Sequence, residues 1–219
     1  MIRVLQNRRY PCAPILSILL IGLPICLRGD DLGGEEVALV VRVEEDWELV
    51  IATPNTNMSG PQVTCISSPF GNLKGLSSSL RLNHQIVDKF VPGGLQLNLV
   101  KQEFVTQSVE SANPRVLSYA NETIRWTQVM YIKNGQLTIE IRNGQSTSLG
   151  AFGALGALRI TVPTTENSLN GYDPEVAVKN SVIGFGSNRV TSLAIKQVRC
   201  FTSNDQVLID KTEHTLHKK

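Results

Sequence analysis

The chain has 219 residues, of which 42% are hydrophobic and 18% are charged, and its formal net charge is +2. This composition is typical of a globular protein, and the length suits one domain of the sandwich or barrel type. The sequence has no cluster of lysine and arginine interleaved with aromatic residues, so nucleic acid is not an expected partner.

The first 29 residues have the features of a secretory signal peptide. Arg3, Arg8 and Arg9 give a positive start, and residues 15–27 form an apolar run. At 1.5 Å per residue this run is too short to cross about 30 Å of hydrocarbon. We therefore expect export to the exterior, periplasm or cell envelope, with removal of residues 1–29 and no stable membrane span afterwards.

Removal of the leader changes both the charge and the cysteine count. Four arginines leave with it, so that 21 − 4 = 17 basic residues face 19 acidic ones, a net charge of −2. Cys65 and Cys200 are the cysteines that remain. An oxidising compartment permits a disulfide between them, but two buried thiols are an equally good interpretation.

Alternation with a period of two dominates the sequence after the leader. In residues 37–51, Val43, Trp47 and Leu49 share one parity, whereas the acidic residues Glu44 and Asp46 share the other. Such alternation predicts a strand with one buried and one outward face. Glu45 interrupts the apolar set, so we expect a bend, bulge or strand end near it.

A hairpin is predicted around Asn134-Gly135, a dipeptide typical of two-residue type I′ turns. Centring the turn there pairs three residues of the first strand with three of the second on a common face, continued by Trp126: Ile132 with Leu137, Met130 with Ile139, and Gln128 with Ile141. The opposite face then carries Val129, Tyr131, Thr138, Glu140 and Arg142. Asn143-Gly144 predicts a second turn of the same type.

Other segments predict further strands and no helix. The strand candidates are Gln62–Ser67, Leu76–Leu82, Leu95–Phe104, Leu158–Val162, Ser181–Phe185, Val190–Phe201 and Gln206–Asp210. Residues 164–180 read as a long polar loop, and residues 211–219 as a polar, frayed tail. Many short strands separated by turns predict an all-β domain over residues 30–210, a two-sheet antiparallel sandwich.

Two regions resemble a known superfamily. Residues 126–129, the hairpin and Asn143-Gly144 resemble the laminin-G and pentraxin-like signature, and Ser192–Phe201 resembles its closing strand. Together they resemble the concanavalin A-like lectin/glucanase superfamily, which implies a jelly roll. The matching residues are structural, so the resemblance supports a fold and not a particular function.

Glu44, Asp46 and Glu48 have the E-x-D-x-E spacing of a laminarinase-like glycosidase family in this superfamily. Side chains at i, i+2 and i+4 share one face of a sheet, so the outer two could serve as nucleophile and acid. Glu45 departs from the family, which has apolar residues between the three. The interpretation we favour is a solvated acidic strand face or edge.

Metal sites have weaker support in the sequence. Oxygen ligands for Ca²⁺ occur in one long loop, at Asn167, Asn170, Asp173 and Glu175, but without a recognised spacing. The histidines are scattered, so no transition-metal site is expected. We therefore expect no cofactor, with Ca²⁺ as the alternative.

The sequence thus favours an exported, non-catalytic, lectin-like binding or structural domain, whose ligand is a carbohydrate or a protein. Two alternatives remain open. One is a glycoside hydrolase that uses Glu44, Asp46 and Glu48. The other is a small subunit of an envelope assembly, which an exposed apolar patch would favour.

Overall fold

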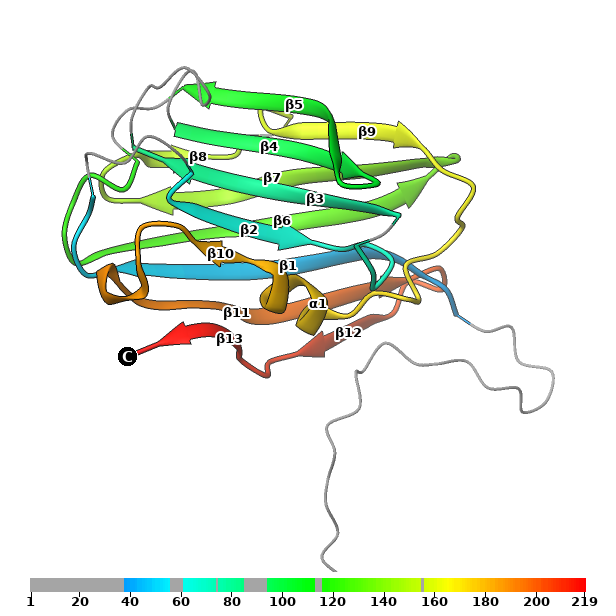
Figure 1. Cartoon of the computed structure of the whole chain (residues 1–219). Helices are drawn as coiled ribbons and strands as arrows, with labels where there is room; N and C mark the ends of the chain where they lie inside the picture. Colours follow the sequence, from blue (N-terminus) through cyan, green and yellow to red (C-terminus); the bar gives the residue numbers. More distant parts are fainter. Residues whose placement is uncertain (1–37, 56–60, 74, 85–93, 113–115, 155) are drawn as a thin grey trace, which may run out of the picture.

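The computed structural model describes residues 38–55, 61–73, 75–84, 94–112, 116–154 and 156–219. In these ranges the chain forms two antiparallel sheets that lie one over the other (Figure 1). The all-β, two-sheet antiparallel sandwich expected from the sequence is therefore confirmed. The expected signal peptide lies outside the described residues. Within them, no helix combines the length and the apolar character that crossing a membrane requires.

The larger sheet has eight strands in the order β12-β11-β1-β6-β7-β8, with β13 also paired to β11 and β9 to β7. Its strands are β1 (Val40–Ile51), β6 (Glu122–Lys133), β7 (Gln136–Ser146), β8 (Gly150–Phe152), β9 (Arg159–Pro163), β11 (Val190–Thr202), β12 (Val207–Asp210) and β13 (His214–Lys218). A 3-10 turn, η1 (Ser187–Arg189), precedes β11. Strand β1 lies in the middle of this sheet, between β6 and β11.

The smaller sheet has five strands in the order β10-β2-β3-β4-β5. They are β2 (Val63–Ser67), β3 (Leu76–Asn83), β4 (Gly94–Lys101), β5 (Phe104–Ala112) and β10 (Val182–Ile183). The sequence predicted a single strand through Phe104, whereas the chain turns at Gln102 and Glu103, which both have positive φ. Strand β5 was not predicted, because it is polar and largely exposed at the sheet edge and so lacks an apolar alternation.

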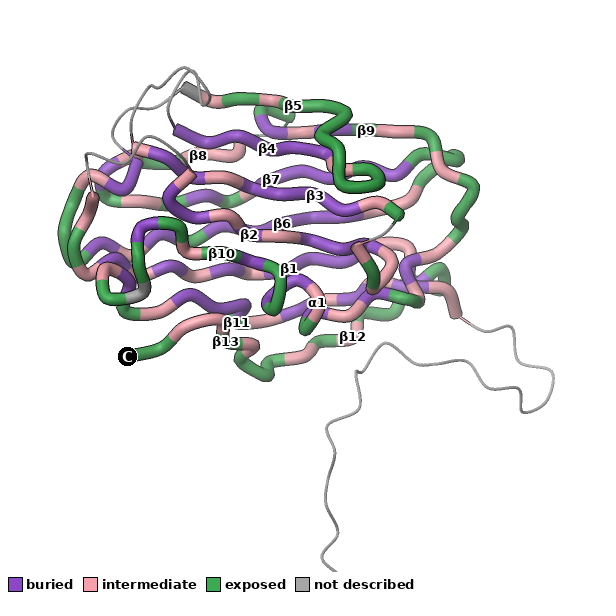
Figure 2. Tube along the Cα trace, viewed as in Figure 1, coloured by how far each residue is buried: buried purple, intermediate pink, exposed green. Residues whose placement is uncertain are grey.

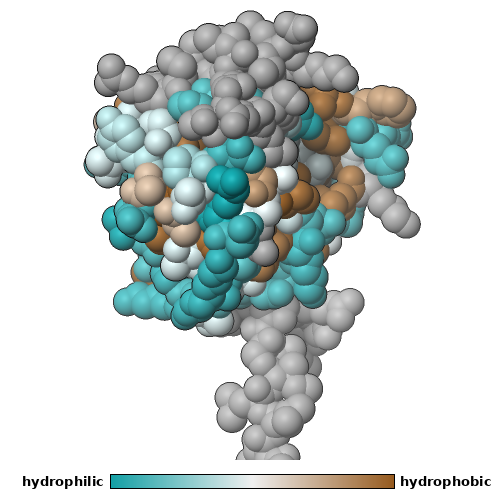
Figure 3. All heavy atoms as spheres, turned by 60° about the vertical axis from the view of Figure 1, so that its left-hand side comes forward, coloured by the Kyte–Doolittle hydropathy of each residue, from teal (hydrophilic) through white to brown (hydrophobic). Residues whose placement is uncertain are grey.

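The core lies between the two sheets, where buried positions alternate with outward ones along the strands (Figure 2). Trp47 of β1 and Trp126 of β6 stack there with 6.0 Å between ring centroids and 2° between planes. Because the two tryptophans are direct partners in the β1–β6 register, their stacking follows from the pairing of these strands. On the surface, hydrophilic residues cover much of the view in Figure 3, and hydrophobic ones gather mainly on its right.

The predicted hairpin is confirmed in its turn and in its register. Asn134 and Gly135 both have positive φ, at 52° and 69°, as a type I′ turn requires. All three predicted pairs occur between β6 and β7: Ile132 with Leu137, Met130 with Ile139, and Gln128 with Ile141.

The second predicted turn is wrong, because Asn143-Gly144 forms a β-bulge within β7. Arg125 pairs with Gln145 and Thr127 with Arg142, so two residues of β7 face one residue of β6. Asn143 takes the left-handed conformation, with φ of 53°. A Cβ on Gly144 would lie 2.3 Å from the Phe152 ring, so only glycine fits under β8.

Two further expectations are corrected by the structure. Within the expected loop, Pro174–Asn180 forms helix α1, whose first turn is capped by Asp173 through a 2.9 Å bond from the backbone of Glu175. The expected frayed tail includes β13, which pairs with β11. Strand β13 is polar and helix α1 has only seven residues, so neither segment has a recognisable apolar pattern. The tail is held by backbone hydrogen bonds to β11 and by a 2.8 Å contact from His214 to Glu175.

Cys65 and Cys200 are buried in different sheets, in β2 and β11, and no disulfide joins them. Burial raises the pKa of the Cys65 thiol well above its ordinary value, and the charge of Glu45 raises it further. A thiol that keeps its proton is a poor nucleophile. Cys65 therefore acts in this structure as a small apolar core residue.

Glu45 points into the core and is fully buried, although β1 continues through it without a break against β6. The expected irregularity occurs one residue later, between Asp46 and Trp47, and only on the β11 side. Four neutral groups donate hydrogen bonds to the carboxylate: Trp47 at 2.8 Å, Tyr172 at 2.9 Å, Ser67 at 3.0 Å and Gln128 at 3.2 Å. These donors come from both sheets and from the loop before α1.

We expect Glu45→Leu to lower the free energy of unfolding by about 3 kcal/mol or more, because it leaves four buried donors without an acceptor. Glu45→Gln should cost much less. Its oxygen can accept from three donors, while its amide donates to the Tyr172 hydroxyl. Urea unfolding of both variants measures the difference, and equal losses in the two would contradict this account.

Burial raises the pKa of the Glu45 carboxyl, although its hydrogen bonds lower it in part. A carboxyl with a higher pKa in the folded state binds its proton more tightly there, so protonation favours folding. The stability of the wild type relative to Glu45→Gln should therefore fall as pH rises from about 4 toward 8. A relative stability that rises over this range would refute the assignment.

Candidate functional site

The outer face of the larger sheet, which points away from the smaller sheet, carries an ordered set of charged side chains. Strand register places outward residues of successive strands side by side. The central row, as we call it, runs across β11, β1, β6, β7 and β9 and consists of Arg199, Glu44, Val129, Glu140 and Arg159. An arginine and a glutamate thus stand on each side of a valine.

On the β11 side of this row, Arg199 binds two carboxylates of β1. Its Nε lies 2.8 Å from Glu44, and its two terminal nitrogens lie 2.5 and 2.9 Å from the two oxygens of Asp46. Two parallel bonds to one carboxylate fix the plane of the guanidinium. The bond to Asp46 raises the pKa of the Arg199 guanidinium, which keeps its charge. Arg42, from the neighbouring row, forms a second ion pair with Glu44.

On the β7 side, Glu140 binds two arginines. Arg159 donates to it over 2.6 Å, and Arg142 forms an ion pair with its other oxygen. The hydrogen bond to Glu140 raises the pKa of Arg159. Each of the two glutamates in the central row therefore carries two arginines.

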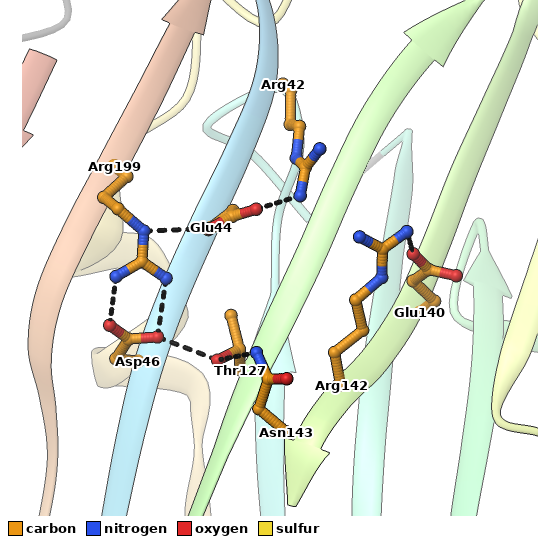
Figure 4. Close-up of polar contacts among 8 residues, drawn as sticks. All are labelled: Arg42, Glu44, Asp46, Thr127, Glu140, Arg142, Asn143 and Arg199. Carbon is orange, nitrogen blue, oxygen red and sulfur yellow. Dashed lines mark hydrogen bonds and ion pairs between the residues drawn. The ribbon is translucent and has the colours of Figure 1, made fainter. Parts of the chain in front are cut away.

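Neutral polar groups connect the two sides below the central row (Figure 4). The Thr127 hydroxyl donates to Asp46 over 2.8 Å, and the Asn143 amide donates to Thr127 over 3.5 Å. The bulge in β7 positions Asn143, because the additional residue turns the strand at this point. Fixed donors and acceptors thus span β11, β1, β6 and β7.

An apolar component accompanies these charges. The row above the central one contains Phe201, Arg42 and Tyr131 in register, and the Arg42 guanidinium lies 5.0 Å from the centre of the Phe201 ring. Val129 points outward yet is fully buried among its long neighbours. Exposed Val207 and Ile209 continue the apolar surface onto β12.

Glu44, Asp46 and Glu48 share the outer face of β1, as their spacing predicts. Strand β1 is internal, so these residues do not protect a sheet edge. Glu48 pairs with Arg125 at 2.7 Å, and all three carboxylates are therefore bound to arginines.

The residues considered for Ca²⁺ have other roles in the structure. Asn170 accepts a 2.8 Å bond from the backbone of Val40, Asp173 caps α1, and Glu175 contacts His214. Asn167 is exposed. Across the ranges that the structure describes, no three His, Cys, Asp or Glu side chains come together to hold a metal ion.

A separate pocket of about 480 Å³ opens where β4 and β9 end and β3 and β7 begin. Its lining includes Phe70, aliphatic residues and two threonines, with Lys101 and Glu166 as its charged residues. It offers fewer fixed polar groups than the outer face of the larger sheet, which is the stronger candidate.

Sequence reasoning missed Arg42, Arg159, Arg199, Thr127 and Asn143 as members of this site. A partial signal was present, because the hairpin register already placed Glu140 and Arg142 on one outward face. The remaining partners come from β1, β9 and β11, and their pairing depends on strand contacts across long stretches of sequence.

No protein-family model matches the sequence, and no curated protein matches it. Among solved structures, an ancestral congerin is similar over 58% of this chain and 88% of that chain, with 12% identity and a TM-score of 0.30. Similarity at this level transfers no function to the chain.

Arg199→Lys should lower the free energy of unfolding by about 1–3 kcal/mol, because lysine cannot reproduce the planar bonds to Glu44 and Asp46. Arg125→Lys is the matched control. Its side chain is exposed and binds only Glu48 among the described residues, so its loss should stay below about 0.5 kcal/mol. Chemical denaturation measures both, and equal losses would contradict the central place of Arg199.

Proposed function

We propose that the chain is an exported, non-catalytic, lectin-like domain that binds carbohydrate on the outer face of its larger sheet. One observation carries the proposal: the arginine–carboxylate pairs of the central row lie on regular strands, beside the row that contains Phe201 and Tyr131. This combination of fixed polar groups and apolar surface meets the chemical requirements of a sugar.

Sugar hydroxyls donate and accept hydrogen bonds at closely spaced positions. Arg199, Asp46 and Thr127 already hold one another in place, so little conformational entropy is lost when a ligand engages them. The ring of a sugar also has C–H faces that pack against apolar groups. Tyr131 and Phe201 supply such a surface within one row of the charged groups.

The arrangement of carboxylates supports binding over glycoside hydrolysis. A glycosidase needs a carboxylic acid that donates a proton to the leaving oxygen. Glu44, Asp46 and Glu48 instead each form an ion pair with an arginine, so their oxygens are already engaged within the protein. The geometry fits three acceptors that orient arginines.

Export and the relation to concanavalin-like lectins are supported by the sequence. The apolar leader supports secretion or envelope localisation, and the hairpin and closing strand support the lectin-like assignment. A role in an envelope assembly would use exposed apolar residues such as Phe104 and Val105 at the edge strand β5. These two lie away from the polar rows, so the two roles do not exclude each other.

Tyr131→Ala should weaken oligosaccharide binding by about tenfold or more, because it removes apolar contact area beside the central row. A glycan array identifies the ligand, and calorimetry with the best oligosaccharide measures the affinity. Tyr119→Ala is the matched control, since Tyr119 is exposed and precedes the start of β6, whereas Tyr131 lies near the end of that strand.

Binding that is absent from the whole array, or lost equally in the two tyrosine variants, would contradict the proposal. Incubation of the wild type with the bound polysaccharide should release no reducing ends. Release that disappears in Glu44→Gln would establish the hydrolase alternative.

A further inference from the structure

The charged side chains around Val129 have a positive excess. Around Val129, four arginines (Arg42, Arg142, Arg159 and Arg199) pair with three carboxylates (Glu44, Asp46 and Glu140), which gives 4 − 3 = +1. The expected mature chain has a net charge of −2, so this excess is a local feature of the face.

The two glutamates of the central row are also less exposed than the arginines that they bind. The Glu140 side chain is 1% exposed and the Glu44 side chain 11%, whereas Arg142 is 26% exposed and Arg42 35%. The two glutamates of the central row therefore lie beneath the guanidinium groups that they orient. A ligand above the central row meets N–H donors before it meets these carboxylates.

Arg42 and Arg142 approach the same place from opposite sides. Arg42 stands one row above Val129 and reaches to Glu44, while Arg142 stands one row below it and reaches to Glu140. Both guanidinium groups are thus brought to the row of Val129, and Figure 4 shows the two side chains reaching toward β6 from either side. The Nε atoms of both arginines are buried and have no hydrogen-bond acceptor within the described part of the chain.

We propose that this face selects acidic carbohydrates and binds their anionic group above Val129, between Arg42 and Arg142. This inference rests on the proposed carbohydrate-binding function and specifies its ligand class. Guanidinium donates paired, planar hydrogen bonds that suit both the carboxylate of a uronic acid and a sulfate ester. The flanking Tyr131 and Phe201 then contact the sugar ring that carries the anion.

The experiment compares three probes by calorimetry: a sulfated oligosaccharide, an oligogalacturonate and a neutral oligosaccharide of similar length. The variants are Arg42→Gln and Arg142→Gln. Arg81→Gln is the control, because Arg81 lies in β3 of the other sheet and its substitution removes the same charge. Thermal unfolding of each variant verifies that it is folded.

We expect one or both acidic probes to bind at least about tenfold more tightly than the neutral one, and Arg42→Gln and Arg142→Gln to remove most of that preference. Arg81→Gln should retain it. The acidic probe that binds more tightly identifies carboxylate or sulfate as the group recognised. Affinity for it should decrease as salt increases.

Other results overturn the inference in distinguishable ways. Equal affinity for neutral and acidic probes refutes acidic selectivity and leaves the proposed function standing. A preference that Arg81→Gln reduces as strongly as Arg142→Gln refutes the location. Equal affinity for a DNA oligonucleotide refutes carbohydrate specificity at this site, and no binding to any oligosaccharide refutes the proposed function itself.

Discussion

The alternation of side chains along β1 is the constraint on which the core and the candidate site both depend. Strand β1 is paired on both sides from Arg42 to Ile51, so each residue of this stretch has a fixed neighbour in β6 and in β11. Glu45 and Trp47 therefore face the core, while Glu44 and Asp46 face outward. A shift of one residue would bury the outer carboxylates and expose the tryptophan.

Buried glutamates have different partners on the two faces of this sheet: neutral donors on the inner face and arginines on the outer face. Glu45 accepts hydrogen bonds from four neutral groups, so its charge is not neutralised and burial raises its pKa. Glu140 is almost as deeply buried but lies between Arg142 and Arg159. The inward carboxylate therefore acts as a structural acceptor, whereas the outward ones hold arginines in fixed positions.

Local signals allowed the hairpin and the fold class to be predicted from the sequence. The turn residues Asn134-Gly135 and the parity of the flanking strands determine one register together, and the structure has that register. Strands β5 and β13 escaped prediction because they are polar, and helix α1 because seven residues are too few to show a helical period. Partners distant in the sequence hold β13 and α1 in place.

The candidate site was predictable only in part for a related reason. The spacing of Glu44, Asp46 and Glu48 indicated a shared outward face, which the structure has. Their arginine partners Arg125 and Arg199 are 77 and 155 residues from the glutamates that they bind. No local pattern reports such a pairing, so the sequence favoured a solvated acidic face or edge for this motif and left a glycosidase as the alternative.

The outer face of the larger sheet around Val129 is the proposed ligand-binding surface. An NMR titration with an acidic oligosaccharide locates the bound ligand. It records the chemical shifts of the backbone amides and of the arginine side chains. We expect the largest changes at Arg42, Val129, Arg142 and Arg199. Changes confined to the outer face of the smaller sheet, or to the pocket beside Lys101 and Glu166, would contradict this proposal.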